Sequence, residues 1–333
     1  MKKFLNDPED FVDEMLDGIY RAHGSVTHTG DDLRCYVTAN PVPGKVGIVT
    51  GGGSGHLPTF LGFVGKGMLD GCAVGGVFQS PSSDQILEVT KYADQGAGVL
   101  YLYGNYTGDI MNFDMAGELA EIEDIETATV MGNDDVASSV VGEEHKRRGV
   151  AGIFFLYKAA GAAAAAMMPL AEVARIAEKA RSRTRTMGVA LSPCIVPEVG
   201  KPSFEIGADE MEIGMGIHGE PGISREPLKP ADQVIDVMMQ RIFDETDYAR
   251  GDEVAVLLNG LGATPLEELY ILFRRVSQLM DERGVVVRHV WLGEFATSME
   301  MAGASVSVLH LDDELEPLVA TSVETPFFKH IKG

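Results

Sequence analysis

The chain has 333 residues, of which 45% are hydrophobic and 23% are charged, so it is long enough for two domains of about 100 to 200 residues each. These fractions are ordinary for a globular protein and exclude a disordered chain or a coiled coil. The 27 Lys and Arg residues against 50 Asp and Glu residues give a net charge of −23. Such a charge repels phosphate backbones and anionic lipid, so neither nucleic acid nor a membrane is expected as a partner.

The three cysteines, Cys35, Cys72 and Cys194, lie far apart without any C-x-x-C spacing, which argues against a disulfide framework or a structural zinc site. No cluster of closely spaced ligands predicts a bound metal. Residues 1–10 contain no apolar stretch, so no secretory signal is expected. We therefore expect a cytoplasmic protein.

In the first half of the chain, short β-branched runs that end in glycine alternate with helical stretches, which is typical of parallel strands joined by crossover helices. Residues 46–49 are predicted to be a buried strand that ends in GGGSGH at 51–56. Residues 99–103 are predicted to be the next clear strand, followed by GNYTGD at 104–109 and a helix. Active-site loops of open parallel sheets lie at the carboxyl ends of strands, so these two loops are candidates to share one crevice.

Residues 151–180 are rich in Ala, Leu, Met and Glu and are predicted to be largely helical, with a break or a new first turn at Pro169. The apolar tract 149–170 in this region is comparable in length to a membrane span. Because Lys158 interrupts it and its alanines contribute little insertion free energy, we expect a buried segment of a soluble fold instead.

The second half is predicted to begin near residue 186, because prolines at 193 and 197 interrupt regular structure after a strand at 187–191. Further along, the patterns predict a hairpin or pair of half-exposed strands at 204–217, helices at 231–243 and 265–282, and strands at 253–258 and 285–291. The expected fold is α/β, with two α/β domains whose mixed or mostly parallel sheets are flanked by helices. The first domain is expected over residues 1–185 and the second, which carries His218, over residues 186–333.

The string GGGSGHLP at 51–58 is the most informative local pattern. Glycines after a buried strand permit positive φ and let backbone N–H groups converge on an oxygen-rich ligand. No G-x-x-x-x-G-K-[ST] run occurs, and no G-x-G-x-x-G run opens a helix with an acidic partner downstream, so neither a P-loop nor a dinucleotide site is predicted. A purely structural interpretation, in which the glycines form a tight strand-to-helix turn, stays open.

Two single residues attract a chemical interpretation. Asp109 follows Gly108 at the start of a predicted helix, where a carboxylate either caps the helix or acts as a general base toward a closely approaching hydroxyl. His218 lies between glycines in GMGIHGEPG at 214–222, where an accessible neutral imidazole is a nucleophile toward carbonyl carbon. An ordinary histidine of a surface loop is the alternative.

Six strings in chain order carry a resemblance to a known family: GGGSGH at 51–56, SPSSDQ at 80–85, NYTGDIMNF at 105–113, GIHGEPG at 216–222, NGLGATPLEELY at 259–270 and TSMEMAG at 297–303. Over nearly its whole length the chain resembles the substrate-binding subunit of dihydroxyacetone kinase. In that family one subunit or domain holds a short ketose, while a separate helical subunit or domain holds the nucleotide.

The resemblance implies that His218 forms a covalent hemiaminal with the ketone carbon and that Asp109 deprotonates the attacking hydroxyl. It further implies that His56 hydrogen-bonds the substrate and assists the same proton transfer. Backbone groups around Gly53, Ser54 and Gly55 are expected to line the sugar hydroxyls. Covalent anchoring is chemically sensible, because a short hydrated sugar exposes few apolar atoms and carbon–nitrogen bond formation selects for a carbonyl.

Two positions depart from the commonest form of the family pattern. Members specific for dihydroxyacetone often carry a glutamate after the loop histidine and a lysine before the NYTGD string, whereas Leu57 and Gly104 stand here. The pocket is therefore expected to be less polar and roomier at one end, which makes a four-carbon ketose such as erythrulose a candidate beside dihydroxyacetone.

The resemblance also implies partners. No cofactor is expected on this chain. ATP or ADP with magnesium is expected on a helical nucleotide-binding subunit. The nucleotide is either the direct phosphoryl donor or a bound nucleotide that a phosphotransferase relay rephosphorylates. A homodimer is implied as well.

Two readings from other classes compete with the kinase subunit. One is a ketose-sensing transcriptional co-regulator, because paralogues of this subunit bind the ligand without phosphorylating it. Asp109 favours the kinase, since a sensor needs His218 but no base. The other, an unrelated α/β oxidoreductase or sugar-binding module, requires a cofactor site that the sequence does not contain.

Overall fold

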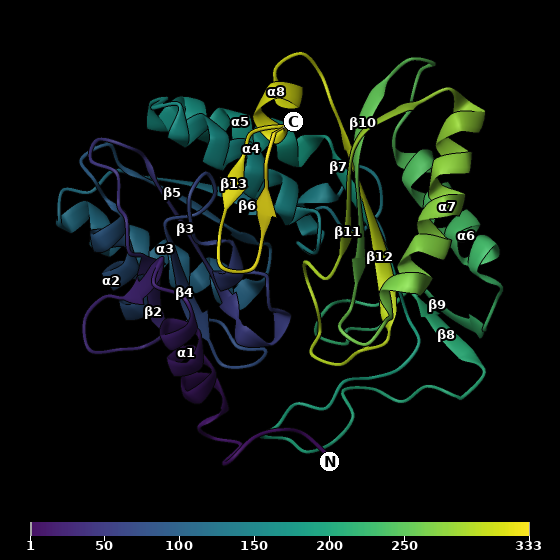
Figure 1. The fold of residues 1–333 in the computed structure, drawn as a ribbon, viewed down its shortest axis with the longest axis horizontal. Coiled ribbons are helices and arrows are strands. Elements are labelled where there is room, and N and C mark those ends of the chain that lie inside the picture. Colours follow the sequence, from purple (N-terminus) through teal and green to yellow (C-terminus); the bar gives the residue numbers. More distant parts are fainter. Residues whose placement is uncertain (1, 333) are drawn as a thin grey trace. The chain divides into compact units, whose positions relative to one another are not determined.

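Two six-stranded sheets, each flanked by helices, form the framework of the computed structural model, which describes residues 2–332 (Figure 1). One unit consists of the segments up to residue 132, from 154 to 181 and from 317 onward, and the other consists of residues 133–153 and 182–316. Both sheets combine parallel and antiparallel pairs. The expected α/β class with two mixed sheets is confirmed.

The expected boundary between the two domains lies between residues 185 and 186. The observed division differs from this expectation in two segments. Residues 133–153 belong to the second unit, where the Val136 N–H donates to a β7 carbonyl at 3.0 Å. Residues from 317 onward belong to the first unit, where the Thr325 hydroxyl donates to the Gly62 carbonyl at 2.7 Å. Sequence patterns mark where regular structure stops, but they do not show that the chain crosses between the two units more than once.

The first unit is built on a sheet with the strand order β1-β2-β4-β3-β5-β6. Its elements are α1 (Phe11–Ala22), β1 (Val26–His28), β2 (Cys35–Thr38), β3 (Gly47–Gly53), β4 (Gly71–Gly75), α2 (Ser83–Ala93), β5 (Val99–Gly104), α3 (Thr107–Ile122), β6 (Thr127–Gly132), α4 (Ile153–Ala165), α5 (Leu170–Ser182), β13 (Val323–Glu324) and β14 (Lys329–His330). β3 is parallel to both of its neighbours, β4 and β5. Their carboxyl ends therefore lie at one edge of the sheet.

The core of the first unit explains this arrangement. Helices α2 and α3 contribute Ile86, Val89 and Phe113 to a buried cluster with alternate side chains of the strands. Thr50 points to the opposite face of β3, where its hydroxyl lies 2.9 Å from the Tyr157 hydroxyl of α4. The sheet is thus covered on both faces, as parallel strands require.

The second unit is built on a sheet with the strand order β11-β10-β12-β7-β8-β9. Its elements are β7 (Thr184–Ala190), β8 (Glu210–Ile213), β9 (Ser224–Pro227), α6 (Ala231–Glu245), β10 (Glu253–Gly260), α7 (Leu266–Arg283), β11 (Val286–Gly293) and β12 (Gly303–His310), with α8 (Leu315–Val319) at the junction with the first unit. Helices α6 and α7 cover one face of this sheet through Ile235, Met238 and Leu269 (Figure 1).

Most predicted elements are confirmed within a few residues, including the interruption between α4 and α5 at Pro169. The predicted hairpin over 204–217 is wrong. Only Glu210–Ile213 forms a strand there, and it pairs with Ser224–Pro227 beyond the glycine-rich loop. Alternating apolar residues indicate a strand but do not specify its partner. The histidine string at 214–222 is therefore the connection between β8 and β9.

Helix α4 is buried over residues 153–164 and contains a buried lysine. Lys158 is 1% exposed. Its ammonium donates to the Thr321 carbonyl at 3.1 Å, lies 3.3 Å from His330 Nδ1 and lies 5.7 Å from the Phe328 ring centroid. Burial lowers the pKa of Lys158 to about 7. No helix within residues 2–332 is long and apolar enough to cross a membrane.

Replacing Lys158 by methionine is expected to change how stability depends on pH. The amine has its ordinary pKa of 10.5 in the unfolded chain, so between about pH 7 and 10.5 the unfolded state binds more protons and wild-type stability rises with pH. Each unit of pKa difference corresponds to about 1.4 kcal/mol. Urea unfolding from pH 7 to 9.5 should show a steeper rise for the wild type than for K158M. Equal slopes would contradict the assignment.

Candidate functional site

The loop that follows β3 packs tightly against the segment that follows β4. A Cβ atom at Gly53 would lie 2.5 Å from the Val77 carbonyl oxygen, and one at Gly55 would lie 2.7 Å from the Phe78 ring. The N–H groups of Ser54 and Gly55 donate to the carbonyls of Gly76 and Val77 at 3.0 and 2.7 Å. These glycines therefore serve close backbone packing. The N–H groups of Ser54 and Gly55 are therefore used within the fold, and the role of the loop's backbone groups toward a ligand stays a prediction.

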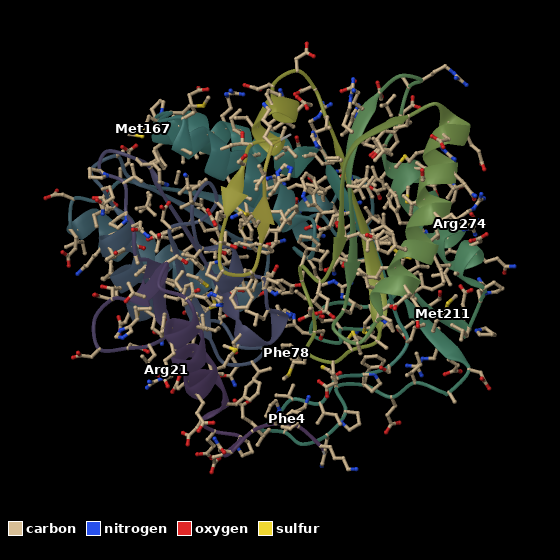
Figure 2. The ribbon with its side chains drawn as sticks, in the orientation of Figure 1. Phe4, Arg21, Phe78, Met167, Met211 and Arg274 are labelled. Carbon is tan, nitrogen blue, oxygen red and sulfur yellow. The ribbon has the colours of Figure 1, made fainter. Side chains whose placement is uncertain are left out.

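Two side chains of the same loop remain chemically relevant. The Ser54 hydroxyl is buried and has no hydrogen-bond partner within residues 2–332, a situation that costs about 1–3 kcal/mol unless a ligand or water pairs with it. His56 is fully buried. Its ring stacks on Phe78, labelled in Figure 2, at 5.0 Å, and it meets the edge of Phe60 at 6.2 Å. Both aromatic contacts fix the plane of the imidazole.

Asp109 is the third residue of α3, at the carboxyl end of β5. The residue before the helix is Tyr106, which makes no side-chain capping hydrogen bond, so the capping position predicted as one role of Asp109 falls elsewhere. Asp109 is 5% exposed. Burial is the main cause of the raised pKa of Cys72 in β4, and the negative charge of Asp109 raises it further. The pKa of Tyr103 in β5 is raised by burial, then by Asp114 and then by Asp109. The carboxylate thus lies within electrostatic range of side chains on β4 and β5.

The first unit brings five predicted site residues to one edge of its sheet. Gly53, Ser54, Gly55 and His56 follow β3, and Asp109 follows the neighbouring parallel strand β5. The segment after β4 contacts both loops, because a Cβ atom at Gly108 would lie 2.6 Å from the hydroxyl of Ser80. Both loops thus pack on the segment that follows β4, and their sharing of one crevice stays a prediction.

His218 belongs to the second unit, where it lies in the loop between β8 and β9. Its backbone N–H donates to Glu220 Oε2 at 2.9 Å, and its ring Nδ1 lies 2.9 Å from Glu220 Oε1. The loop closes on itself, because the Gly216 N–H donates to the Glu220 carbonyl at 3.0 Å. Gly219 has φ +84°, which favours glycine. The imidazole is 26% exposed, so this histidine is an oriented group in a structured loop.

The partner of the histidine is a carboxylate. Burial raises the pKa of Glu220, but the hydrogen bond and charge of His218 outweigh burial and lower it to about 2. Glu220 is therefore ionised at any physiological pH. A carboxylate acceptor at Nδ1 requires that nitrogen to carry a proton, so the neutral ring presents its lone pair at Nε2.

Sequence reasoning missed the residues that support this loop. The Ser298 hydroxyl donates to the Ile217 carbonyl at 2.5 Å, and the Arg148 guanidinium donates to the Gly214 carbonyl at 2.9 Å. Glu220 itself stands two positions after the histidine in the GIHGEPG string, which was a usable signal. Arg148 and Ser298 are 70 and 80 positions from His218 in the sequence, and no local pattern indicates them.

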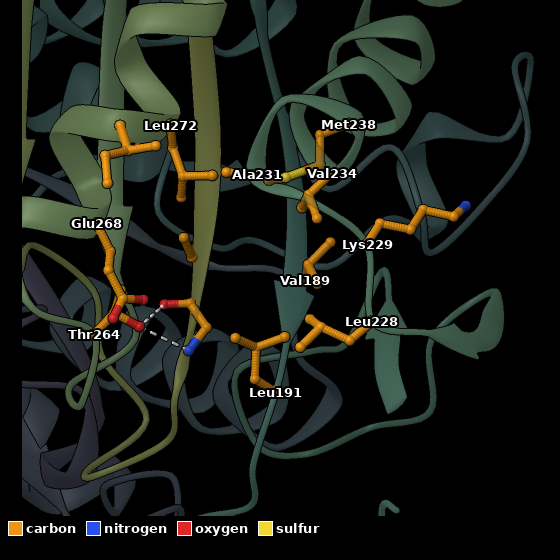
Figure 3. A pocket seen from close by; sticks show the side chains of 13 residues that line it. Val189, Leu191, Leu228, Lys229, Ala231, Val234, Met238, Thr264, Glu268 and Leu272 are labelled. Atoms are coloured by element: carbon orange, nitrogen blue, oxygen red, sulfur yellow. Dashed lines mark hydrogen bonds between the residues drawn. The ribbon is translucent and has the colours of Figure 1, made fainter. Parts of the chain in front are cut away.

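The second unit also contains an apolar pocket of about 230 Å³ among α6, α7 and the adjoining ends of β7 and β12 (Figure 3). Val189, Val234, Met238 and Leu272 line it, with Glu268 at one side. None of the predicted site residues contributes to it. An aliphatic lining offers few groups that recognise a polyhydroxylated ketose, so the pocket is not a candidate for the predicted chemistry.

Residues 17–327 match the family described as the Dak1 domain. The chain belongs to this family, as its six sequence strings indicated.

Two relatives illustrate the range of the family. The chain is 47% identical, over 94% of its length and 95% of the relative's, to PTS-dependent dihydroxyacetone kinase 1, dihydroxyacetone-binding subunit DhaK, from Listeria innocua. It is 42% identical to D-erythrulose kinase from Mycolicibacterium smegmatis, where the match covers 100% of this chain and 58% of that protein. This chain thus corresponds to a whole subunit in one relative and to part of a longer chain in the other.

Solved structures show the same fold. The dihydroxyacetone kinase from C. freundii in complex with AMP-PNP and Mg2+ matches with a TM-score of 0.91 and 31% identity, covering 99% of this chain and 61% of that chain. The dihydroxyacetone kinase operon co-activator Dha-DhaQ matches with a TM-score of 0.89 and 29% identity, covering 96% of this chain and 98% of that chain. One fold therefore serves both kinases and a regulator.

Proposed function

We propose that this chain is the ketose-binding subunit of a dihydroxyacetone-type kinase. It binds dihydroxyacetone or the related ketose erythrulose through His218 and presents a terminal hydroxyl for phosphorylation by a separate nucleotide-binding subunit. The observation that carries the proposal is the imidazole held at Nδ1 by an ionised glutamate, in a chain of the Dak1 family.

The anchoring step is nucleophilic addition. Nε2 forms a bond to the ketone carbon, and the C=O π electron pair moves to the oxygen, which takes up a proton. The positive charge that develops on the ring lies next to the Glu220 carboxylate, and it disappears when the Nδ1 proton is released. The adduct therefore has the mass of the protein plus one whole ketose, with no loss of water. Glycerol has no carbonyl and is excluded.

The first unit supplies the groups that we assign to proton transfer and hydroxyl recognition. Asp109 is the base that accepts the proton of the hydroxyl attacking the phosphoryl group, with His56 assisting. The buried Ser54 hydroxyl, with backbone groups at Gly53 and Gly55, is assigned to the sugar hydroxyls. ATP or ADP with magnesium, on the partner subunit, supplies the phosphoryl group and its charge neutralisation.

The substrate is proposed to be a ketose of three or four carbons. β5 ends at Gly104, which pairs with Gly132 at the end of β6, so neither strand end places a side chain beside the start of the Asp109 loop. The absence of a side chain at these two glycines supports the proposal that the site has space for the extra carbon of erythrulose. With the cognate nucleotide subunit, the specificity constants for dihydroxyacetone, L-erythrulose and D-erythrulose decide the question. A clearly higher constant for dihydroxyacetone would remove the erythrulose assignment.

Intact-mass measurement tests the anchoring proposal directly. The full chain is incubated with dihydroxyacetone, L-erythrulose, D-erythrulose or glycerol. We expect a mass increase of one ketose molecule for at least one ketose and none for glycerol. Peptide mapping should locate the increase at residue 218. The absence of any adduct with all three ketoses would contradict the proposal.

A ketose-sensing co-regulator is the second candidate, which the likeness to Dha-DhaQ favours. Asp109 weighs against it, because ligand sensing does not require a base at the hydroxyl. Phosphorylated ketose formed by the wild type with the nucleotide subunit and donor would support the kinase. Adduct formation without any product under the same conditions would support the sensor.

A further inference from the structure

Arg148 is one of the residues that support the loop carrying His218. Arg148 Nη2 donates to the Gly214 carbonyl at 2.9 Å, at the first residue of the loop. A Cβ atom at Gly216 would lie 2.5 Å from Arg148 Nη1 and 2.1 Å from Glu220 Oε2. Glycine at 216 thus permits the guanidinium and the Glu220 carboxylate to lie against the same backbone position.

Arg148 is in turn fixed by Asp135. Its Nε donates to Asp135 Oδ2 at 2.8 Å, and its Nη2 lies 2.7 Å from the same oxygen. The Asp135 side chain is 4% exposed and that of Arg148 is 14% exposed. Asp135 is itself anchored, because its Oδ1 accepts the Ala137 N–H at 2.9 Å and its N–H donates to the Arg148 carbonyl at 3.1 Å. Two donors of a planar fork on one carboxylate leave the guanidinium little freedom to rotate.

The charges alternate along this path from Asp135 through Arg148 and Glu220 to His218. Burial raises the pKa of Asp135 to about 6 against the opposing effect of Arg148, so the buried carboxylate relies on the arginine to stay ionised. Burial raises the pKa of Glu220, whereas His218 lowers it, and the arginine charge makes a smaller contribution in the same direction as His218. Arg148 therefore interacts electrostatically with both carboxylates.

We propose that Arg148, fixed by Asp135, is a positioning residue that sets the orientation and the Nδ1–H tautomer of His218 through Glu220 and the Gly214 carbonyl. Neither residue touches the ketose in this proposal. The inference rests on the proposed function only for its catalytic consequence, since the orientation and tautomer of the ring are properties of the protein without ligand. Supporting groups of this kind typically change activity by about 10- to 100-fold when removed.

The experiment compares Arg148→Met, Arg148→Lys and the double variant Asp135→Asn/Arg148→Met with the wild type. The double variant removes the buried carboxylate that Arg148→Met alone would leave unpaired. Arg274→Met is the matched control, because Arg274 pairs with the exposed Asp232 on α6 of the same unit. The first measurement is the pair of imidazole ¹⁵N chemical shifts of His218 without ketose.

The wild type and Arg274→Met should show separate shifts typical of an Nδ1–H ring. Arg148→Met and the double variant should show averaged shifts of mixed tautomers, and Arg148→Lys should lie between. The second measurement is the adduct fraction at a fixed ketose concentration, expected to fall about 10- to 100-fold in Arg148→Met. Thermal unfolding of each variant checks that it is folded.

Wild-type ¹⁵N shifts in a folded Arg148 variant, together with a full adduct fraction, would overturn the inference. If the wild type forms no adduct, the proposed function fails, whereas altered shifts in Arg148→Met still support the positioning role. A loss of adduct with unchanged shifts would also overturn it, because the arginine would then act by another route.

Discussion

Replacing His218 by alanine is expected to abolish the ketose adduct and to reduce phosphorylation to the background of the partner subunit. The imidazole provides the proposed carbon–nitrogen bond, and no hydrogen bond of a remaining loop group replaces a covalent link to a small hydrated ligand. Intact mass measures the adduct, and coupled phosphorylation with the nucleotide subunit measures turnover.

The chain offers a closely matched control for this variant. His310 also lies in the second unit, is half-buried and has Nε2 3.2 Å from a carboxylate oxygen of Asp252. His310→Ala removes an equivalent imidazole–carboxylate pair, so it is expected to keep the wild-type adduct fraction. An adduct that survives in His218→Ala would show that another residue is the nucleophile. Equal loss of the adduct in both variants would show that a general loss of folding is responsible.

Replacing Asp109 by asparagine is expected to separate binding from catalysis. Asparagine preserves the volume and a hydrogen-bond acceptor but cannot accept a proton, so turnover should fall by about 100- to 10,000-fold. The adduct at His218 should persist, because carbonyl addition does not require a base at the hydroxyl. Single-turnover phosphorylation and intact mass on the same samples measure the two effects independently.

Asp114→Asn is the control for this second variant, because Asp114 lies on the same helix, α3, and is exposed. It should leave both readouts at the wild-type level. If Asp109→Asn retains wild-type turnover, Asp109 is not the base. If it loses the adduct as well, Asp109 contributes to ketose binding and the separation of roles proposed for the two units is incorrect.

The parts of the fold that the sequence predicts are those whose signals are local. The strands at 46–49 and 99–103 are short buried runs that end in glycine, and each corresponds to a parallel strand whose carboxyl end carries a candidate site loop. The break at Pro169 is likewise local, because proline ends or restarts a helix wherever it stands. These signals are sufficient to place Asp109 and His56 at one sheet edge.

Other parts depend on contacts between distant segments. β12 (Gly303–His310) was not predicted, although it is the central strand that pairs antiparallel with both β10 and β7. Its small residues alternate with valines, which suits burial on both faces but gives no strong periodicity of its own. The residues that surround His218 could not be predicted for the same reason, because Arg148 and Ser298 contact its loop only in the folded unit.

The interleaved path of the chain has a consequence for biosynthesis. The first unit contains the hairpin of β13 and β14 together with the Thr321 carbonyl that accepts a hydrogen bond from buried Lys158. Residues 182–316, which form most of the second unit, leave the ribosome before that hairpin does. All six strands of the first sheet lie before residue 133, so they are available early in translation. Lys158 in α4, in contrast, can meet the Thr321 carbonyl only after residues 182–316 have been synthesised, so completion of the first unit waits until most of the second unit has emerged.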